Sequence, residues 1–348
     1  MASLSVIMPV HRDGKAFRRS LAAVYRSTER PEEVIVASDG APESARDFAR
    51  RKGARVLHTP TAKGPAHARN KGARAATGDL FFFLDADVVV HADAIGKVVQ
   101  RFSDLPEYAA LVGSYDDAPD DDAFLSQYRN LLHHYTHQHG NEDTITFWGA
   151  CGAIRKEAFW AVGGFDADYE RPSIEDIEFG ARLREAGCRI RLCPEIQVTH
   201  LKAWDAVSMV KTDVLDRALP WTCLLLERGT LPDDLNVRRK ERWSTVAAFA
   251  IPLFVFASVG VPALGGLAAG AGLGVLVLNR SFYQFLRRKR GTWFSVRAVF
   301  WHWVYYLCCG TGAALGLLLR ALSQVGVRET PLHDLLPRPA RDPSVVDG

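Results

Sequence analysis

The chain has 348 residues, of which 48% are hydrophobic, and it carries a formal net charge of +3. This length accommodates a catalytic domain with a substantial core and a second region, and so small a net charge does not indicate a nucleic-acid-binding protein. The six cysteines form no CxxC pair, which excludes a zinc ribbon or a dithiol redox motif of that kind.

Residues 1–110 alternate short apolar runs with helical patterns. Strands are expected at 4–10, 32–38, 54–59 and 78–85, and a helix at 66–76. Such alternation predicts an α/β fold with a sheet flanked by helices on both faces. Ligands bind at the carboxyl ends of the strands in these sheets. Asp39 and Asp85 end two of the strands, so we expect them to meet at one edge of the sheet. The opening "MASLSVIMPV" has no basic n-region, and it is interpreted as a strand rather than a signal peptide.

Residues 111–200 follow a different pattern. A helix is expected over 122–140, an extended segment over 146–156 and a helix over 156–164. The stretch "PSIEDIEF" then begins another helix, and a strand is expected over 188–200. From 203 to 242 the chain is amphipathic, with tryptophan and basic residues, which favours a helix in a membrane interface. The alternative is a helix that packs on the sheet.

Two long uncharged runs follow, at 245–278 and 298–319. A membrane span needs roughly 20 apolar residues, so the first run predicts two short helices hinged near 260–262 or 265–266, and the second predicts one span. The basic clusters "RRKER" and "RRKR" flank the first run, and a hairpin would keep both on the cytoplasmic side. The third segment would be spanning, re-entrant or interfacial. A buried hairpin in a soluble protein is the alternative.

These patterns divide the chain into four parts. A catalytic domain is expected at 1–202, an amphipathic interfacial segment at 203–242, a membrane region of two or three helices at 243–320, and a polar tail at 321–348.

The run "FFFLDADVVV" ends a predicted buried strand with two carboxylates, Asp85 and Asp87. Buried close together they would repel each other and raise one pKa, and a divalent cation would remove that repulsion. Mg²⁺ or Mn²⁺ takes one or two carboxylates together with phosphate oxygens. The motif therefore indicates a metal–diphosphate site, with a solvated loop as the alternative.

Asp39 could accept from a nucleobase or ribose, and Arg69 could bind phosphate or orient a carboxylate rather than lie on the helix surface.

At residues 4–200 the chain resembles glycosyltransferase family 2. The resemblance rests on "SVIMPVHRDG", "EVIVASDG", "GPAHARNKGARAATGDLFFFLDADV", "GACGAIRKEAFWAVGGFD" and "SIEDIEFGARLREAG", in that order. It implies the GT-A fold, a Rossmann-like mixed sheet that binds a nucleotide sugar. It implies that Asp39 contacts the nucleoside, that Asp85 binds ribose or Arg69, and that Asp87 binds the metal. The implied donor site also includes Pro9, His11 and Ala86. Two departures are Ser38, where the family usually has an acid, and His11, where it usually has an aromatic residue.

Further site residues follow from the resemblance. The acid that matches Asp176 is the catalytic base of an inverting transfer, with Glu175 as the fallback. A purely structural alternative is a capping box of Ser173 and Asp176. His200 completes the metal shell, unless it is a capped surface histidine. Trp148 and Gly149 line the sugar or acceptor side. The histidines of "HHYTHQHG" include a pair at zinc-ligand spacing, but no further ligand follows, so we expect solvated histidines on an acceptor-side helix.

The sequence therefore predicts a membrane-anchored, metal-dependent inverting glycosyltransferase. Its donor would be a UDP- or GDP-type nucleotide sugar, and its acceptor a lipid-linked molecule or a saccharide. The catalytic domain would face the cytoplasm from a multi-pass position in the inner membrane, in contact with lipids and without a nucleic-acid partner. One alternative is a catalytically degenerate, nucleotide-binding membrane scaffold. Another is a nucleotidyltransferase, although "PVHRDGKAF" lacks the glycine-rich phosphate loop expected of one.

Overall fold

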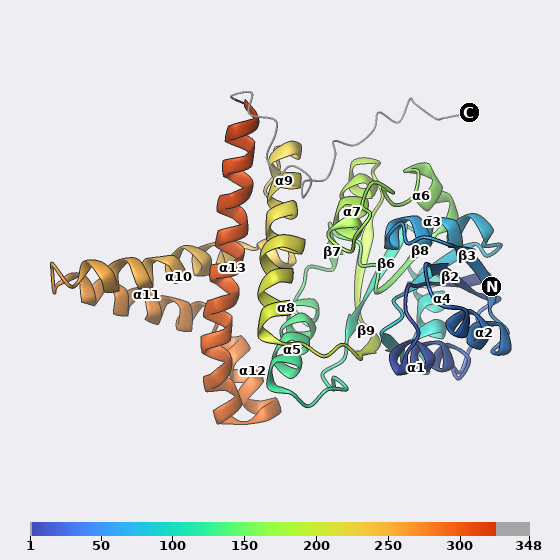
Figure 1. The fold of residues 1–348 in the computed structure, drawn as a ribbon, viewed down its shortest axis with the longest axis horizontal. Coiled ribbons are helices and arrows are strands. Elements are labelled where there is room, and N and C mark those ends of the chain that lie inside the picture. The colour runs from blue at the N-terminus through green and yellow to red at the C-terminus, as the bar shows by residue number, and fades with distance from the viewer. Residues whose placement is uncertain (1, 325–348) are drawn as a thin grey trace. The chain divides into compact units, whose positions relative to one another are not determined.

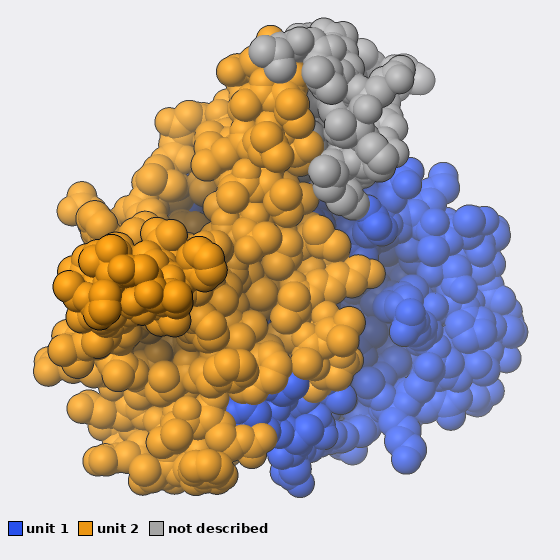
Figure 2. Space-filling view, turned by 60° about the vertical axis from the view of Figure 1, so that its left-hand side comes forward, with its two compact units in different colours: residues 1–203, 338–348 blue, residues 204–337 orange. Residues whose placement is uncertain are grey.

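The computed structural model describes residues 2–324, which fall into two compact units, residues 2–203 and residues 204–324 (Figure 2). Each unit is described by itself. Most of the expected polar tail at 321–348 lies outside the described residues.

The first unit is built on a nine-stranded mixed sheet, as counted over the described residues (Figure 1). The strand order is β3-β2-β1-β4-β8-β6-β9-β5, and β7 pairs with β9. The strands are β1 Leu4–Val10, β2 Glu33–Asp39, β3 Arg55–Thr59, β4 Leu80–Leu84, β5 Val88–Val90, β6 Ala110–Tyr115, β7 Asp143–Thr144, β8 Cys151–Arg155 and β9 Ile190–His200. β1 is parallel to β2 and β4, so the expected α/β sheet is confirmed, and residues that follow β1, β2 and β4 emerge at one edge.

Helices connect these strands. They are α1 Lys15–Val24, α2 Glu43–Arg51, α3 Pro65–Ala75, α4 Ala94–Asp104, α5 Phe124–Gln138, α6 Lys156–Ala161 and α7 Glu175–Glu185. The extended segment expected over 146–156 is a strand only from Cys151. The residues before it form a turn, which presses the backbone of this stretch against the side chain of Arg69, as described below.

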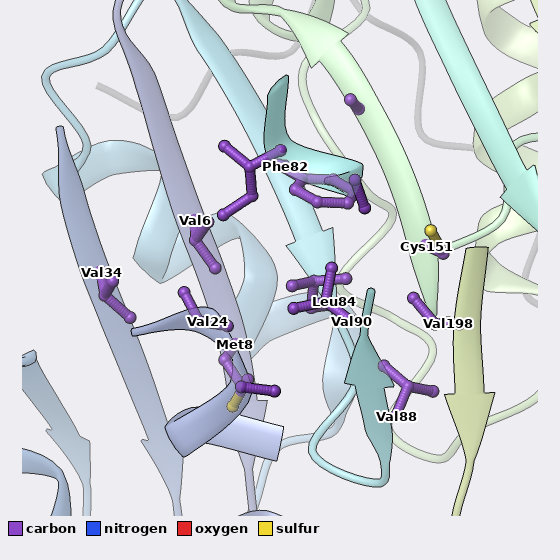
Figure 3. Close-up of a cluster of buried hydrophobic side chains, with 14 of the residues drawn as sticks. Val6, Met8, Val24, Val34, Phe82, Leu84, Val88, Val90, Cys151 and Val198 are labelled. Atoms are coloured by element: carbon purple, nitrogen blue, oxygen red, sulfur yellow. The ribbon is translucent and has the colours of Figure 1, made fainter. Parts of the chain in front are cut away.

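Both faces of β4 are buried, which explains why its sequence is a continuous apolar run rather than an alternating one. Phe82 and Leu84 join a core cluster with Val6 and Met8 of β1 (Figure 3). Phe81 and Phe83 point to the opposite face, where they meet the rings of Phe147, Phe159 and Phe165. Phe179 packs on Phe147 and Phe165 in the same cluster. Burying each such side chain contributes about 1.5–3 kcal/mol, so β4 is a rigid support for the acids that follow it.

The second unit is helical. It contains α8 Ala206–Lys211, a π-helical stretch η1 Thr212–Ala218, α9 Leu219–Arg228, the 3₁₀ turn η2 Leu235–Val237, α10 Arg239–Ala257, α11 Leu264–Leu278, α12 Arg280–Arg290 and α13 Thr292–Gln324. α9 packs on α13 through Leu219, Cys223 and Leu319. Part of the apolar surface of the expected interfacial segment is therefore buried against a helix of its own unit.

The expected helical hairpin is present. α10 and α11 lie side by side (Figure 1), and the break between them falls at 258–263, which includes the expected hinge at 260–262. Within the described residues, α13 is the one helix that is long and apolar enough by itself to cross a membrane. α11 and α12 pass the same test only as a pair, bent by 63°. The expected two or three spans thus correspond to one such helix, or two if the bent pair is counted.

Candidate active site

Three sequence-predicted residues lie where parallel strands end. Asp39 is the last residue of β2, His11 follows β1, and Asp85 follows β4. Because β1 lies between β2 and β4 in a parallel arrangement, all three emerge at the same edge of the sheet. Pro9, within β1, and Ala86, in the turn after β4, belong to the same edge and are partly exposed.

Arg69 is the centre of the site. It lies on α3, is only 3% exposed, and donates from one guanidinium nitrogen to Asp85 Oδ1 at 2.8 Å and from the other to Glu175 Oε1 at 2.9 Å. Burial by itself would lower the pKa of Arg69, but Asp85, Glu175 and Asp176 outweigh it and hold the pKa above its usual value. Arg69 therefore orients carboxylates, as one sequence interpretation proposed, and the alternative of a surface charge is wrong.

The surroundings of Arg69 leave its guanidinium little freedom. The ring of Phe165 lies 5.3 Å away, centroid to guanidinium carbon. A Cβ added to Gly149 would come within 2.7 Å of the guanidinium, so only glycine fits there. The Arg69 Nε has no hydrogen-bond partner among the described residues.

Glu175 and Asp176 begin α7 but have different partners. Glu175 is 4% exposed, and its second carboxylate oxygen accepts from the Ser173 backbone N–H at 2.9 Å. Asp176 is partly exposed and accepts from the Gly149 N–H at 3.1 Å. The residue that precedes the helix is Ile174, without a side-chain cap, and not Ser173 as the structural alternative of a capping box requires. The Ser173 N–H donates to Glu175, the residue before Asp176.

Asp87 and His200 face each other across paired strands. Val88, which follows Asp87, is paired with His200 in the β5–β9 ladder, and the Asp87 carbonyl accepts from the Leu201 N–H. Asp87 Oδ2 lies 3.8 Å from His200 Nε2. Burial first, and then the neighbouring Asp85, raise the pKa of Asp87 to about 6. A carboxylate oxygen and an imidazole nitrogen are both ligand types that a divalent transition-metal ion such as Mn²⁺ can take.

Among the described residues no group of three or more His, Cys, Asp or Glu is placed to hold a metal. A cation bound here would fill its remaining positions with water or ligand oxygens. His200 is only 7% exposed, so it is not a surface histidine.

Asp39 is held by the loop before α3. Its carboxylate accepts from the backbone N–H groups of Lys63 and Gly64 at 2.9–3.1 Å. Gly64 has φ +94°, and a side chain there would strike the backbone of Glu170 at 2.6 Å. The loop that Asp39 stabilises is therefore packed tightly on the segment that precedes α7.

The aromatic side of the site corrects one expectation. Trp148 packs edge-on against Tyr115 and His137. His134 and His137 are 8% and 7% exposed, and their Nδ1 atoms hydrogen-bond to backbone carbonyls of β6. The histidines expected to be solvated are thus in large part structural. They are buried because β6 leaves β8 after Val112 and its later carbonyls need other donors.

Sequence reasoning missed Phe165 and Tyr115, which contact Arg69 and His200. No local motif marks either residue. A weak signal for Tyr115 was its place beside Asp116, which follows β6 as Asp85 follows β4.

Comparison with known proteins agrees with this geometry. Residues 5–163 match the family described as glycosyl transferase family 2, and residues 129–204 match the N-terminal domain of galactosyltransferase. Residues 5–163 belong to glycosyltransferase family 2. The first unit has a mixed sheet like that of the GT-A fold, and its motifs occur along the chain in the order on which the resemblance rested.

Two curated relatives are informative. A pre-mycofactocin glycosyltransferase of Mycobacterium tuberculosis (strain H37Rv) is 31% identical over 211 residues, covering 57% of this chain and 42% of that protein. A validoxylamine A glucosyltransferase of Streptomyces hygroscopicus subsp. limoneus is 27% identical over 242 residues, covering 58% and 53%. The family 2 chain thus spans about half the length of these relatives.

A solved structure of similar fold is a mannosyltransferase from Pyrobaculum calidifontis, in complex with GDP-Man and Mn²⁺. It aligns with a TM-score of 0.55 over 90% of this chain and 87% of that one, at 18% identity. At this identity the likeness shows the fold alone.

Proposed function

We propose that this chain is a metal-dependent, inverting glycosyltransferase that moves a sugar from a nucleotide-diphosphate donor to a lipid-linked or saccharide acceptor at a membrane. The observation that carries the proposal is the Arg69 bridge. It ties Asp85 on the strand side to Glu175 at the start of α7, and so brings the end of β4 and the start of α7 into one site.

The donor would lie along the edge of the sheet. Asp39 would contact the nucleoside, with Pro9 and His11 beside it, and Asp85 and Ala86 would face the ribose and diphosphate. In this arrangement Arg69 is a positioning residue, because both of its charged partners are protein carboxylates.

Asp176 is the candidate general base. Glu175 is committed to Arg69 and to the Ser173 N–H, whereas Asp176 is partly exposed beside Gly149. In an inverting transfer the base takes the proton of the acceptor hydroxyl while that oxygen attacks the anomeric carbon and the diphosphate leaves from the opposite face. Gly149 and Trp148 would line the sugar and acceptor side.

Asp87 and His200 are the candidate metal ligands. A divalent cation bound to them would supply charge stabilisation to the departing diphosphate. Burial and the neighbouring Asp85 raise the pKa of Asp87, and a bound cation would favour the ionised carboxylate there.

The helical unit supports attachment to a membrane, with the catalytic unit on the cytoplasmic side. α10 and α11 expose large apolar side chains along most of their length, among them Val246, Leu253, Phe256, Leu267 and Leu273. Helices that are apolar on all sides are typical of a lipid environment. A lipid-linked acceptor follows from this location and not from a binding motif.

The test is a thermal-shift screen of the detergent-solubilised full chain with UDP, GDP and CMP, each with Mn²⁺ and with EDTA. We expect one diphosphate to raise the melting temperature in Mn²⁺ but not in EDTA, and Asp87→Asn to lose the shift. Lys97→Gln, a surface change on α4, is the matched control and should keep it. A folded protein that responds to no nucleotide would contradict the proposal and favour a scaffold without donor binding.

A further inference from the structure

We infer that Tyr115 and Asp116, at the end of β6, are positioning residues that hold Asp87 and His200 together as a metal-binding pair. This inference rests on the proposed function. It assigns a role to two residues that the sequence motifs do not include.

Tyr115 fixes the plane of the His200 imidazole. Its ring stacks on His200, with centroids 4.3 Å apart and planes at 18°. On another side it meets Trp148 edge-on, with centroids 4.7 Å apart and planes at 89°. Because a metal ligand must point its nitrogen lone pair at the ion, a neighbour that fixes ring orientation tunes affinity. The same tyrosine therefore contacts a candidate metal ligand and a candidate sugar-side residue.

Asp116 ties together the strands that carry the two ligands. Its carboxylate accepts from His91 Nε2 at 2.9 Å, and His91 directly follows β5, the short strand after Asp87. It also accepts from the hydroxyl of Thr199, the neighbour of His200 on β9. Asp116 is 6% exposed, so both bonds are partly shielded from water and favour one register of these strands.

Helix α5 holds this pair of residues in place. Asn130, His134 and His137 lie at i, i+4 and i+7, on one face of the helix. Asn130 donates to the Asp116 carbonyl at 2.8 Å, and His134 and His137 hydrogen-bond through Nδ1 to the carbonyls of Tyr115 at 2.8 Å and Gly113 at 3.1 Å. The histidine run that suggests a zinc site in the sequence thus forms a row of bonds that fixes the end of β6 behind His200.

The expected effect on metal binding can be compared with the energy of the stacked pair itself. A stacked aromatic pair is worth about 0.5–1.5 kcal/mol, which corresponds to about 2- to 12-fold in an equilibrium constant. Loss of a residue that orients a metal ligand typically weakens metal binding about 10- to 100-fold. We therefore expect Tyr115→Leu to weaken Mn²⁺ binding about tenfold, and Tyr115→Phe, which keeps the ring, to stay within about twofold of the wild type.

The experiment is a titration of the detergent-solubilised full chain with MnCl₂, alone and with UDP or GDP, in which free Mn²⁺ is read by electron paramagnetic resonance. Thr199→Val, which removes the hydroxyl bond to Asp116 at similar volume, should weaken binding several-fold and serves as a second variant should Tyr115→Leu fail to fold. Tyr108→Leu is the matched control, since Tyr108 is a 3% exposed tyrosine of the same unit that contacts Arg189. It should lower the melting temperature and leave Mn²⁺ affinity unchanged.

Two outcomes contradict the inference in different ways. Equal Mn²⁺ affinity in wild type, Tyr115→Leu and Thr199→Val would overturn the positioning role while leaving the proposed metal site intact. Wild-type protein that binds no Mn²⁺ under any of these conditions would overturn the metal site itself and the positioning role with it.

Discussion

Glu175 and Asp176 show how neighbouring acids of one helix acquire separate roles. Glu175 is buried and shares Arg69 with Asp85, whereas Asp176 is partly exposed and accepts from the backbone N–H groups of Gly149 and Ile177. A buried ion pair is costly to break by removing one partner. A general base must instead be able to receive a proton from an approaching hydroxyl. Neutral replacement should therefore affect turnover at Asp176 and stability at Glu175.

We expect Asp176→Asn to fold and to bind the donor nucleotide like wild type, and to lose turnover by about 10²- to 10⁴-fold, the usual contribution of a general base. Turnover is measured as release of nucleotide diphosphate from the donor, with and without acceptor. Glu175→Gln should instead lower stability by about 3 kcal/mol, because Arg69 keeps only one of its two charged partners. If Asp176→Asn retained turnover while Glu175→Gln folded normally and lost it, the assignment of the base would have to be exchanged.

At the scale of single elements, the strands and helices of the first unit were largely predictable. The bounds of β1 agree with the expected residues, and those of β2, β3, β4 and α3 differ by one or two. Apolar runs and glycine boundaries carry this information locally. The turn at 149–150 was not predicted, because its conformation depends on Arg69, which packs against Gly149 from a distant part of the chain.

The candidate site was predictable where a motif ends a strand, as at Asp39, Asp85 and Asp87. Tyr115 and the buried histidines of α5 were not predictable, because their roles depend on where the pairing of β6 with β8 ends and its register with β9 shifts. Side-chain bonds to strand carbonyls leave no periodic signal. The spacing of the α5 histidines was recognised, but the sequence could not show that backbone carbonyls, rather than water or zinc, would be their partners.

The contact of α13 with η1 and α9 depends on small residues, and this gives a second prediction with an internal control. A Cβ at Gly312 would lie 2.4 Å from Ala218 Cβ and 2.8 Å from the Leu219 backbone nitrogen, whereas one at Gly270 of α11 would meet nothing within 4 Å. We expect Gly312→Ala to destabilise this unit by about 1–3 kcal/mol through overpacking. Gly270→Ala should be neutral or stabilising by up to about 1 kcal/mol, since alanine favours the helix.

Melting of the two variants in the same detergent, followed by circular dichroism, checks this prediction. Opposite signs for the two changes are expected. Equal effects would show that Gly312 is not a close packing contact and that the two helices can separate to admit a methyl group.

At the scale of the whole molecule, the two units differ in the kinds of side chain that they expose. The catalytic unit carries the site acids on a sheet, and the helical unit exposes apolar side chains, with Trp243 and Trp293 at 65% and 73% exposure beside the basic clusters. α12 is amphipathic: it buries Phe282, Tyr283 and Leu286, and its last turn is Arg287, Arg288, Lys289 and Arg290. Tryptophan next to arginine and lysine is the usual composition of a membrane–water boundary.

This composition predicts a lipid preference that can be measured on the intact protein. We expect the full chain, reconstituted from detergent, to float with vesicles, and a soluble nucleotide sugar to remain accessible to it from the side that carries α12. Basic residues near an anionic surface contribute about 1 kcal/mol each. Replacement of all four basic residues at 287–290 by glutamine should therefore reduce binding to phosphatidylglycerol vesicles by at least tenfold, and binding to phosphatidylcholine vesicles little, because the apolar hairpin is unchanged.

Arg50→Gln with Arg51→Gln, on α2 of the catalytic unit, is the matched charge control and should bind like wild type. Failure of the wild-type chain to float with either vesicle would show that α10, α11 and α13 cover an apolar surface of a protein partner, and the acceptor would then have to be sought among soluble saccharides.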